Sequence, residues 1–198
     1  MAMAIGAHTK QIWTIGHSKH DASRFIEILN QFEITAVVDV RTIPMSKMAP
    51  QFNEAALKAA LMEVGISYIA MGKELGGRPA EDDLYDKHGH VLYSRLADST
   101  EFKQGLNRLL IGMEQFRIAV MCSEGKPEGC HRHLLIGKVL VSQGCEVINI
   151  LPDGSFKTYT ELSPESNQES LIDLGEEEMW KSVLPVRQES QQNDSFFS

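Results

Sequence analysis

One stretch decides how the rest of the chain is interpreted: Ile118-Ala-Val-Met-Cys-Ser-Glu-Gly-Lys-Pro-Glu-Gly-Cys-His-Arg-His133. The apolar run at 118–121 is typical of a buried strand, and the Gly- and Pro-containing residues after it indicate a loop. Residues 134–141 then have the pattern of a helix. The stretch therefore predicts a strand, a loop and a helix, with thiol, imidazole, carboxylate and guanidinium groups gathered at the junction.

Strands and helices alternate in the same way along the rest of the folded part. Apolar runs predict five strands, at 12–15, 34–40, 66–71, 118–121 and 146–151. Between them, apolar residues recur at helical spacing, and Asp21 or Ser23, Asn53 and the capping-box pair Asp98 and Glu101 mark helix starts. The predicted fold class is α/β: a single Rossmann-like domain with a mainly parallel sheet of about five strands and helices on both faces.

The chain divides into three parts by composition. Residues 1–10 are expected to be a flexible N-terminus, 11–160 the α/β domain, and 161–198 an acidic, largely disordered tail with one helix at 171–184. The tail holds 2 Lys and Arg against 9 Asp and Glu, whereas 1–160 hold 17 against 18. The net charge of −8 thus comes mainly from the tail. Residues 80–96 are polar and irregular, and we expect them to form a loop or lid.

The cysteine content and hydropathy limit the class of protein. Three cysteines, an odd number, argue against a secreted disulfide framework and for reduced thiols in the cytosol. The first residues lack the basic and apolar regions of a signal peptide, and no apolar run approaches the ~20 residues of a membrane span. We therefore expect a cytoplasmic protein without membrane contact, whose acidic tail docks a protein partner.

Most unusual polar residues follow the predicted strands, where ligands of open parallel sheets bind. The first strand ends at His17 and Ser18, and the second ends at Asp39 and Arg41. The remaining candidates follow the second, third and fourth strands or lie within the third: Ser46, Tyr68, Gly76, Gly77, Arg78, Cys122, Glu124, Cys130, His131 and Arg132. One edge of the sheet is therefore the predicted site.

Several motifs resemble the family known as domain of unknown function 488. They are Thr14-Ile-Gly-His-Ser18, Val38-Asp-Val-Arg41, Leu75-Gly-Gly-Arg78, Met121-Cys-Ser-Glu124 and Cys130-His-Arg132, with Pro44, Ser46 and Phe52 between them. Together they span the chain from residue 12 to about 151, and as a set they are specific. The resemblance implies a compact α/β domain of Rossmann-like type, and an association of some relatives with DNA repair or phage defence.

The charged candidates suggest an anionic substrate and proton transfer. Arg41, Arg78 and Arg132 would hold a phosphate, and Gly76 and Gly77 would let the backbone approach it. As alternatives, Arg41 and Arg132 would form structural salt bridges with Asp39 and Glu124. For proton transfer the candidates are Asp39, Glu124 and His17, because a carboxylate in a partly dry cleft has a raised pKa and histidine titrates near neutral pH. Tyr68 could reach the same cleft.

The thiols leave three alternatives open. Cys122, Cys130 and His131 could bind zinc with one position free, but no Cys-x-x-Cys pair is present and two candidates are adjacent, so we expect no cofactor. Cys130 could instead be a nucleophile with a lowered pKa at a helix start. Cys122 could be a small buried apolar residue.

The leading functional hypothesis is an enzyme that cleaves a hydrolytic or glycosidic bond in a phosphate-bearing substrate, a nucleotide or nucleic acid. One alternative is thiol chemistry at Cys130, alone or with Cys122 as a redox couple. The other is a non-catalytic module that binds a nucleotide or a protein.

Overall fold

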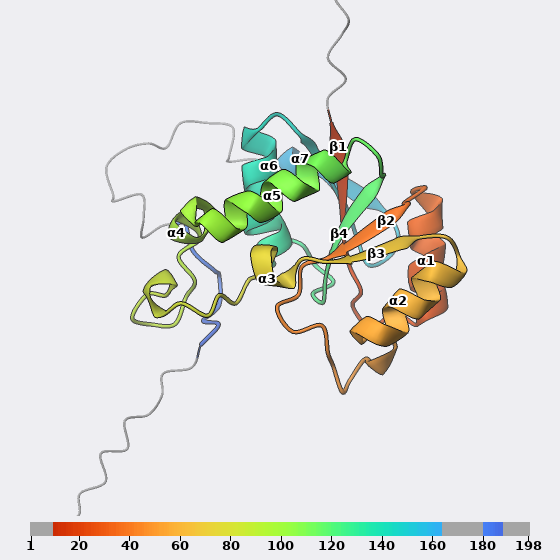
Figure 1. The fold of residues 1–198 in the computed structure, drawn as a ribbon, viewed down its shortest axis with the longest axis horizontal. Helices are drawn as coiled ribbons and strands as arrows, with labels where there is room; N and C mark the ends of the chain where they lie inside the picture. The colour runs from red at the N-terminus through yellow and green to blue at the C-terminus, as the bar shows by residue number, and fades with distance from the viewer. Residues whose placement is uncertain (1–9, 164–179, 188–198) are drawn as a thin grey trace, which may run out of the picture.

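A computed structural model of the chain describes residues 10–163 and 180–187 (Figure 1). A six-stranded sheet with the order β3-β2-β4-β1-β5-β6 forms its centre. The strands are β1 (Gln11–Gly16), β2 (Ala36–Asp39), β3 (Ser67–Ala70), β4 (Ile118–Cys122), β5 (Glu146–Ile150) and β6 (Phe156–Thr158). The first five strands are parallel to one another, which confirms the α/β class. The sixth, β6, is an antiparallel edge strand beside β5 that the sequence did not predict.

Helices cover both faces of the sheet, and Figure 1 shows them as two groups. One face packs against α1 (Ala22–Gln31), η1 (Pro50–Phe52) and α2 (Glu54–Glu63). The other face packs against α3 (Gly72–Leu75), α4 (Tyr93–Asp98), α5 (Thr100–Gly112), η3 (Arg132–Gly137), α6 (Lys138–Ser142) and α7 (Tyr159–Leu162). The short turn η2 (Asp82–Leu84) precedes α4.

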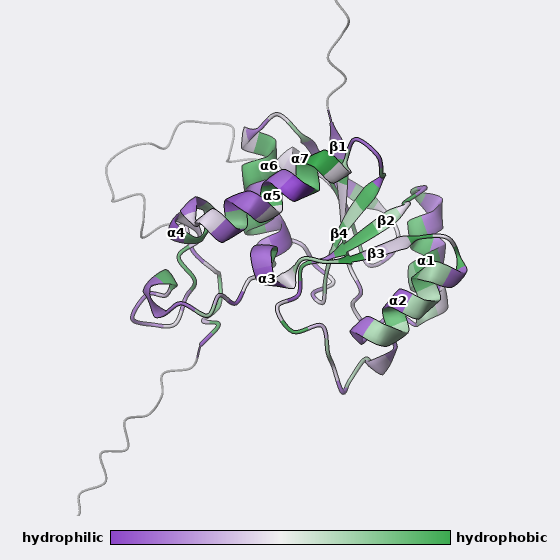
Figure 2. Ribbon diagram, viewed as in Figure 1, coloured by the Kyte–Doolittle hydropathy of each residue, from purple (hydrophilic) through white to green (hydrophobic). Residues whose placement is uncertain are grey.

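The central strands are apolar because both of their faces are covered. All four residues of β2 are buried. Its adjacent residues Val37 and Val38 belong to the two hydrophobic clusters on opposite faces of the sheet. Figure 2 shows the hydrophobic colour along β2 and β4. Side chains alternate across a strand, so each strand contributes to both cores at once.

Helix starts agree with the sequence only in part. Asp21 accepts a hydrogen bond from the Arg24 amide and caps α1 as predicted. The cap of α5 is Ser99 and not Asp98, because its hydroxyl accepts the Phe102 amide hydrogen. Asn53 precedes α2 but does not cap it, because its side-chain oxygen accepts from the Ser46 amide instead. That bond closes the loop between β2 and α2.

The expected loop at 80–96 is more ordered than the sequence suggested. It contains η2 and the first part of α4, and Tyr93 is buried. The expected loop is found at 85–92, which has no helix or named strand, whereas 82–84 and 93–96 are helical. Val91, Leu92 and Leu96 also enter the core. These apolar residues anchor the segment next to α5.

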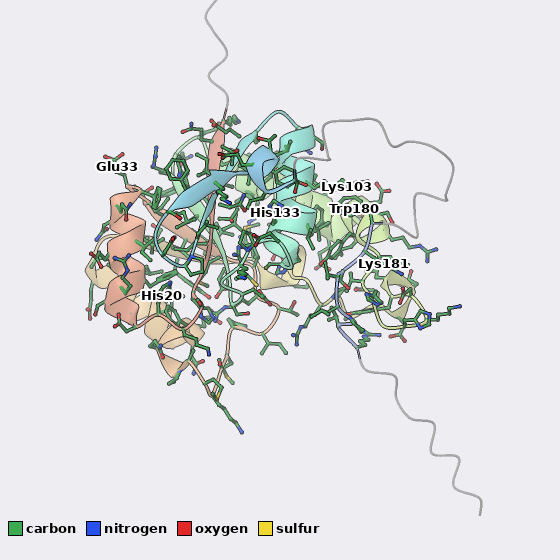
Figure 3. The ribbon with its side chains drawn as sticks, turned by 180° about the vertical axis from the view of Figure 1, so that it is seen from behind. His20, Glu33, Lys103, His133, Trp180 and Lys181 are labelled. Atoms are coloured by element: carbon green, nitrogen blue, oxygen red, sulfur yellow. The ribbon has the colours of Figure 1, made fainter. Side chains whose placement is uncertain are left out.

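Residues 180–187, here called the C-terminal strap, return to the domain and pack beside α4. The Trp180 indole donates to the Leu134 carbonyl at 2.9 Å, and Lys181 pairs with Asp86 at 2.8 Å. In Figure 3, Trp180 and Lys181 mark the start of the strap. Of the helix expected at 171–184, residues 171–179 lie outside the described part, and 180–184 are not helical. Among the described helices, none has the length and apolar content to cross a membrane.

Candidate active site at the carboxyl edge of the sheet

A cleft of about 510 Å³ lies at the carboxyl edge of the parallel strands. It brings together nine of the residues predicted from the sequence: His17, Arg41, Ser46, Gly77, Arg78, Cys122, Glu124, Cys130 and His131. Five others do not line it: Ser18, Asp39, Tyr68, Gly76 and Arg132. The edge of the sheet thus located most of the cleft residues, but the sequence did not show which side chains are buried behind the cleft.

The ends of β1 and β4 form one side of the cleft. The His17 amide donates to the Cys122 carbonyl at 2.9 Å, and the Ser18 amide donates to the Ser123 carbonyl at 3.1 Å. A Cβ atom on Gly16 would lie 1.8 Å from the Glu124 carbonyl oxygen, so only glycine allows the loop after β4 to approach β1 this closely. Gly16 thus fixes the backbone position of Glu124.

His17 is held as a neutral ring. Its Nδ1 lies 3.0 Å from the Ser18 carbonyl, which can only accept, so Nδ1 carries the hydrogen and Nε2 accepts from Arg41 at 3.3 Å. The ring stacks on Phe52 with a centroid distance of 4.4 Å. Burial lowers the pKa of His17, although the Ser18 carbonyl opposes this effect. In this arrangement His17 orients Arg41. The lone pair of His17 Nε2 accepts the Arg41 hydrogen bond and is not free to accept a proton from a substrate.

Asp39 and Arg41 form a buried ion pair behind the cleft. The Asp39 carboxylate accepts from the Arg41 guanidinium at 2.6 Å, from the Arg41 amide at 3.0 Å and from the Tyr68 hydroxyl at 2.8 Å. Asp39 is 1% exposed. Its acceptor sites are occupied, so the structure provides no geometry for Asp39 or Tyr68 to act on a substrate, and most of the Arg41 charge is neutralised by Asp39.

Arg132 is fully buried and does not reach the cleft. Its guanidinium donates to the carbonyl of Glu124 at 2.5 Å and to that of Gly125 at 2.9 Å. It therefore holds neither a substrate phosphate nor the Glu124 carboxylate, the two alternatives drawn from the sequence. Arg132 is a positioning residue that fixes the loop carrying Glu124.

Glu124 presents a carboxylate to the cleft. Its Oε2 accepts from the thiols of Cys122 at 2.8 Å and Cys130 at 3.1 Å, and the residue remains exposed. Burial by itself raises the pKa of Glu124, but the two thiol hydrogen bonds, its own backbone amide and His131 together lower it to about 2. The direction is opposite to the raised pKa expected for a carboxylate in a dry cleft, because the surrounding donors favour the ionised form.

Cys122, Cys130 and His131 meet beside Glu124. The Nδ1 atom of His131 lies 3.8 Å from each sulfur, and the three ligand atoms are within 4.8 Å of one another. The Cys130 thiol and burial raise the pKa of Cys122. Burial alone lowers the pKa of His131, but Cys122, Glu124 and the Val40 carbonyl raise it overall. Both cysteines are nearly inaccessible, so Cys130 is poorly placed as a nucleophile for a large substrate.

The loop after α3 forms the opposite wall. A Cβ on Gly77 would lie 2.7 Å from the His131 ring, so this glycine makes room for the imidazole rather than for a ligand. Gly76 similarly makes room for the Gly72 carbonyl and the Thr42 hydroxyl. Arg78 is exposed in the cleft and has no ion pair within the described residues. Ser46 lies at the rim, where its hydroxyl accepts from the Met48 amide.

Two parts of the cleft were not predicted. Tyr93 lines it, and burial raises the pKa of its hydroxyl. The strap supplies the residues 182–186 to the wall, and exposed Val183 and Leu184 lie in the same lining as exposed Ile43 and Met45. The available signal was weak: Val91, Leu92 and Leu96 around Tyr93 are apolar, within a segment that is polar as a whole. Nothing in the sequence indicated where the strap docks.

His133 lies outside the cleft. Its Nε2 is 2.9 Å from the Ser163 hydroxyl, and its ring packs against Tyr159. Burial lowers the pKa of His133, although Asn149 opposes this effect. A second hollow of about 650 Å³ lies at the other end of β1, near Gln11 and Trp13. It is shallow and contains none of the predicted site residues.

The fold and the cleft define an α/β domain with a polar site at the carboxyl edge of its sheet. The chain belongs to the family described as domain of unknown function DUF488, whose family model matches residues 21–139. A comparison with curated proteins finds no significant match, and a comparison with solved structures finds none either.

Proposed function

We propose that the chain is an enzyme that hydrolyses a bond in a phosphate-bearing substrate, a nucleotide or nucleic acid, in the cytosol. One observation carries the proposal: the exposed carboxylate of Glu124 and the guanidinium of Arg78 line the same cleft. A carboxylate and a cation in one concave site are the groups needed to activate a water molecule and to bind an anion. The reacting bond would lie over Glu124.

Glu124 is ionised at neutral pH and held in place, as a general base must be, and its lowered pKa makes it a weak base. Its Oε2 is occupied by the two thiols, and no partner is found for Oε1 in the part of the chain that the structure describes. The backbone beneath it is fixed by Arg132 and by the close approach of Gly16. A rigidly held base that reaches its substrate typically accelerates a reaction by about 10²–10⁴-fold.

The wall opposite Glu124 supports a nucleotide-like ligand. Arg78 presents a guanidinium that has no ion pair within the described residues, and its fork suits phosphate oxygens. Apolar Ile43, Met45, Val183 and Leu184 are exposed at the cleft and would contact the less polar part of such a ligand. A cleft with an apolar lining and a few placed polar groups is typical of small-molecule sites.

The test is a product assay on a substrate panel with matched variants. The panel contains nucleosides, nucleoside mono-, di- and triphosphates, and single- and double-stranded oligonucleotides. We expect turnover of a phosphate-bearing member, at least about 10²-fold slower in Glu124→Gln and unchanged in Glu128→Gln, a control in the same loop that does not line the cleft. Equal turnover by Glu124→Gln, or equal turnover of the unphosphorylated nucleoside, would contradict the proposal.

A further inference from the structure

We propose that Cys122, Cys130 and His131 bind one zinc ion, with its fourth position open to the cleft. Zinc ligands at about 2.3 Å for sulfur and about 2.0–2.1 Å for nitrogen, in a tetrahedron, lie about 3.6 Å apart. The observed separation of His131 Nδ1 from each sulfur is 3.8 Å. Both nitrogen-to-sulfur distances are therefore close to the spacing that a tetrahedral ion requires, and the two sulfurs lie within 4.8 Å of each other.

The histidine is oriented as a metal ligand. Its Nε2 lies 3.2 Å from the Val40 carbonyl, which can only accept, so Nε2 carries a hydrogen and Nδ1 is the atom left to bind an ion. Zinc-binding histidines commonly donate their other ring N–H to a backbone carbonyl in this way, which fixes the ring orientation. Gly77 packs against the His131 ring, and a side chain at position 77 would collide with that ring.

The adjacency of Cys130 and His131 does not prevent joint binding. These two residues precede the π-helical turn η3, and their side chains turn toward the same point, with sulfur and Nδ1 3.8 Å apart. Cys122 completes the set from the end of β4, on the other side of the loop. Two thiolates and an imidazole are a donor set that suits zinc, whereas Mg²⁺ and Ca²⁺ prefer oxygen ligands.

The three ligands and Glu124 line the same cleft. Zinc would replace the two thiol hydrogens that Glu124 Oε2 accepts, because cysteine binds metal as the thiolate. Three protein ligands and one free position are the arrangement of catalytic rather than structural zinc sites. A water molecule at the free position would lie near the Glu124 carboxylate, which could accept its proton. The role of Glu124 as proton acceptor rests on the proposed function. Zinc binding does not, so it is measured without any substrate.

The first experiment is a Co²⁺ titration of the full-length, reduced, metal-free protein. We expect saturation at about one equivalent, with a thiolate-to-Co²⁺ charge-transfer band and tetrahedral visible bands that zinc then removes. Cys122→Ser, Cys130→Ser and His131→Asn should each abolish or shift the spectrum. Cys145→Ser is the matched control, since this third cysteine is also buried but lies outside the cluster. An absent charge-transfer band, or one that persists in both cysteine variants, would overturn the proposal.

A second experiment needs no variant and therefore does not depend on the folding of the substituted chains. A thiol reagent is added to the wild-type protein with and without zinc. Zinc should slow modification of Cys122 and Cys130 and leave Cys145 unchanged, as read by mass spectrometry of peptides. Modification of Cys122 and Cys130 that zinc does not slow would overturn the zinc site. A Cys122–Cys130 disulfide that forms in the presence of zinc would also overturn it and would indicate a redox pair instead.

Discussion

The Nε2 atom of His131 lies 3.2 Å from the carbonyl oxygen of Val40, so the end of β2 sets the orientation of an imidazole that follows β4. This bond joins two neighbouring strands of the sheet at their carboxyl ends. It leaves Nδ1 directed at Cys122 and Cys130. The carboxyl ends of two neighbouring strands thus position the Cys122, Cys130 and His131 cluster within the cleft.

Gly77→Ala should weaken metal binding with little loss of stability. The added methyl would lie 2.7 Å from the His131 ring, which must then rotate away from the sulfurs. Since displacing the support of a metal-bound histidine typically costs about 10–100-fold in affinity, we expect a loss of Co²⁺ affinity in that range. Gly129→Ala is the control, because it lies in the same cleft and its Cβ would meet nothing within 4 Å. Equal affinities in the two variants would argue against the assigned role of His131.

Arg78→Ala should impair substrate binding more than the chemical step. Loss of a hydrogen bond from a charged donor costs about 1.5–3 kcal/mol, so KM should rise by roughly 10–100-fold while kcat changes little. Arg78→Lys should recover part of the loss. Arg108→Ala serves as the control, since Arg108 pairs with Glu74 and does not line the cleft. A fall in kcat at unchanged KM would contradict anion binding by Arg78.

Arg132→Met should lower both stability and turnover. The carbonyls of Glu124 and Gly125 would lose their buried charged donors, each worth about 1.5–3 kcal/mol. Urea unfolding should therefore show a free energy of unfolding lower by about 3 kcal/mol. Under conditions where the variant is fully folded, kcat should fall because Glu124 is displaced, while KM is retained. A variant as active as the wild type would show that the loop does not need Arg132.

Asp86→Asn should detach the strap, with an effect that depends on pH. Burial alone raises the pKa of Asp86, but the hydrogen bonds from Lys181 and the His90 and His88 amides lower it to about 2. The folded pKa is below the unfolded value of about 4, so the ionised group stabilises the fold above about pH 4. This contribution disappears as the pH falls through about 2.

The measurement is unfolding by urea at a series of pH values. The difference between wild type and Asp86→Asn should be constant from pH 7 to about pH 4 and should shrink toward pH 2. Asp83→Asn, an exposed neighbour in η2, is the control and should show no such difference. A difference that grows as the pH falls would contradict the assigned direction of the pKa shift.

The sheet and the site edge were predictable from sequence because both depend on local patterns. The continuous apolar run at 118–121 specifies a strand covered on both faces, and parallel strands bring their carboxyl ends to one edge. The position of a residue along the chain does not reveal whether its side chain lines the cleft or is buried behind it. Asp39 ends a strand and Arg132 follows one, yet neither lines the cleft as Glu124 does. Asp39 pairs with Arg41, and Arg132 donates to backbone carbonyls.

The strap was missed because its contacts are far apart in sequence. Trp180 bonds to Leu134, and Lys181 pairs with Asp86 across 95 positions. The residues themselves are compatible with a helix, and the antiparallel pairing of Lys181 with Leu92 favours the extended form. The sequence did not favour zinc for a related reason: the spacing from Cys122 to Cys130 resembles no common motif, but the loop brings the two sulfurs within 4.8 Å of each other.

The most direct measurement is anomalous diffraction at the zinc absorption edge from crystals of zinc-loaded protein. The account predicts one strong peak in the cleft, about 2.3 Å from the sulfurs of Cys122 and Cys130 and about 2.0–2.1 Å from Nδ1 of His131. A peak at another place, or no ordered peak at this cluster in fully loaded protein, would contradict it.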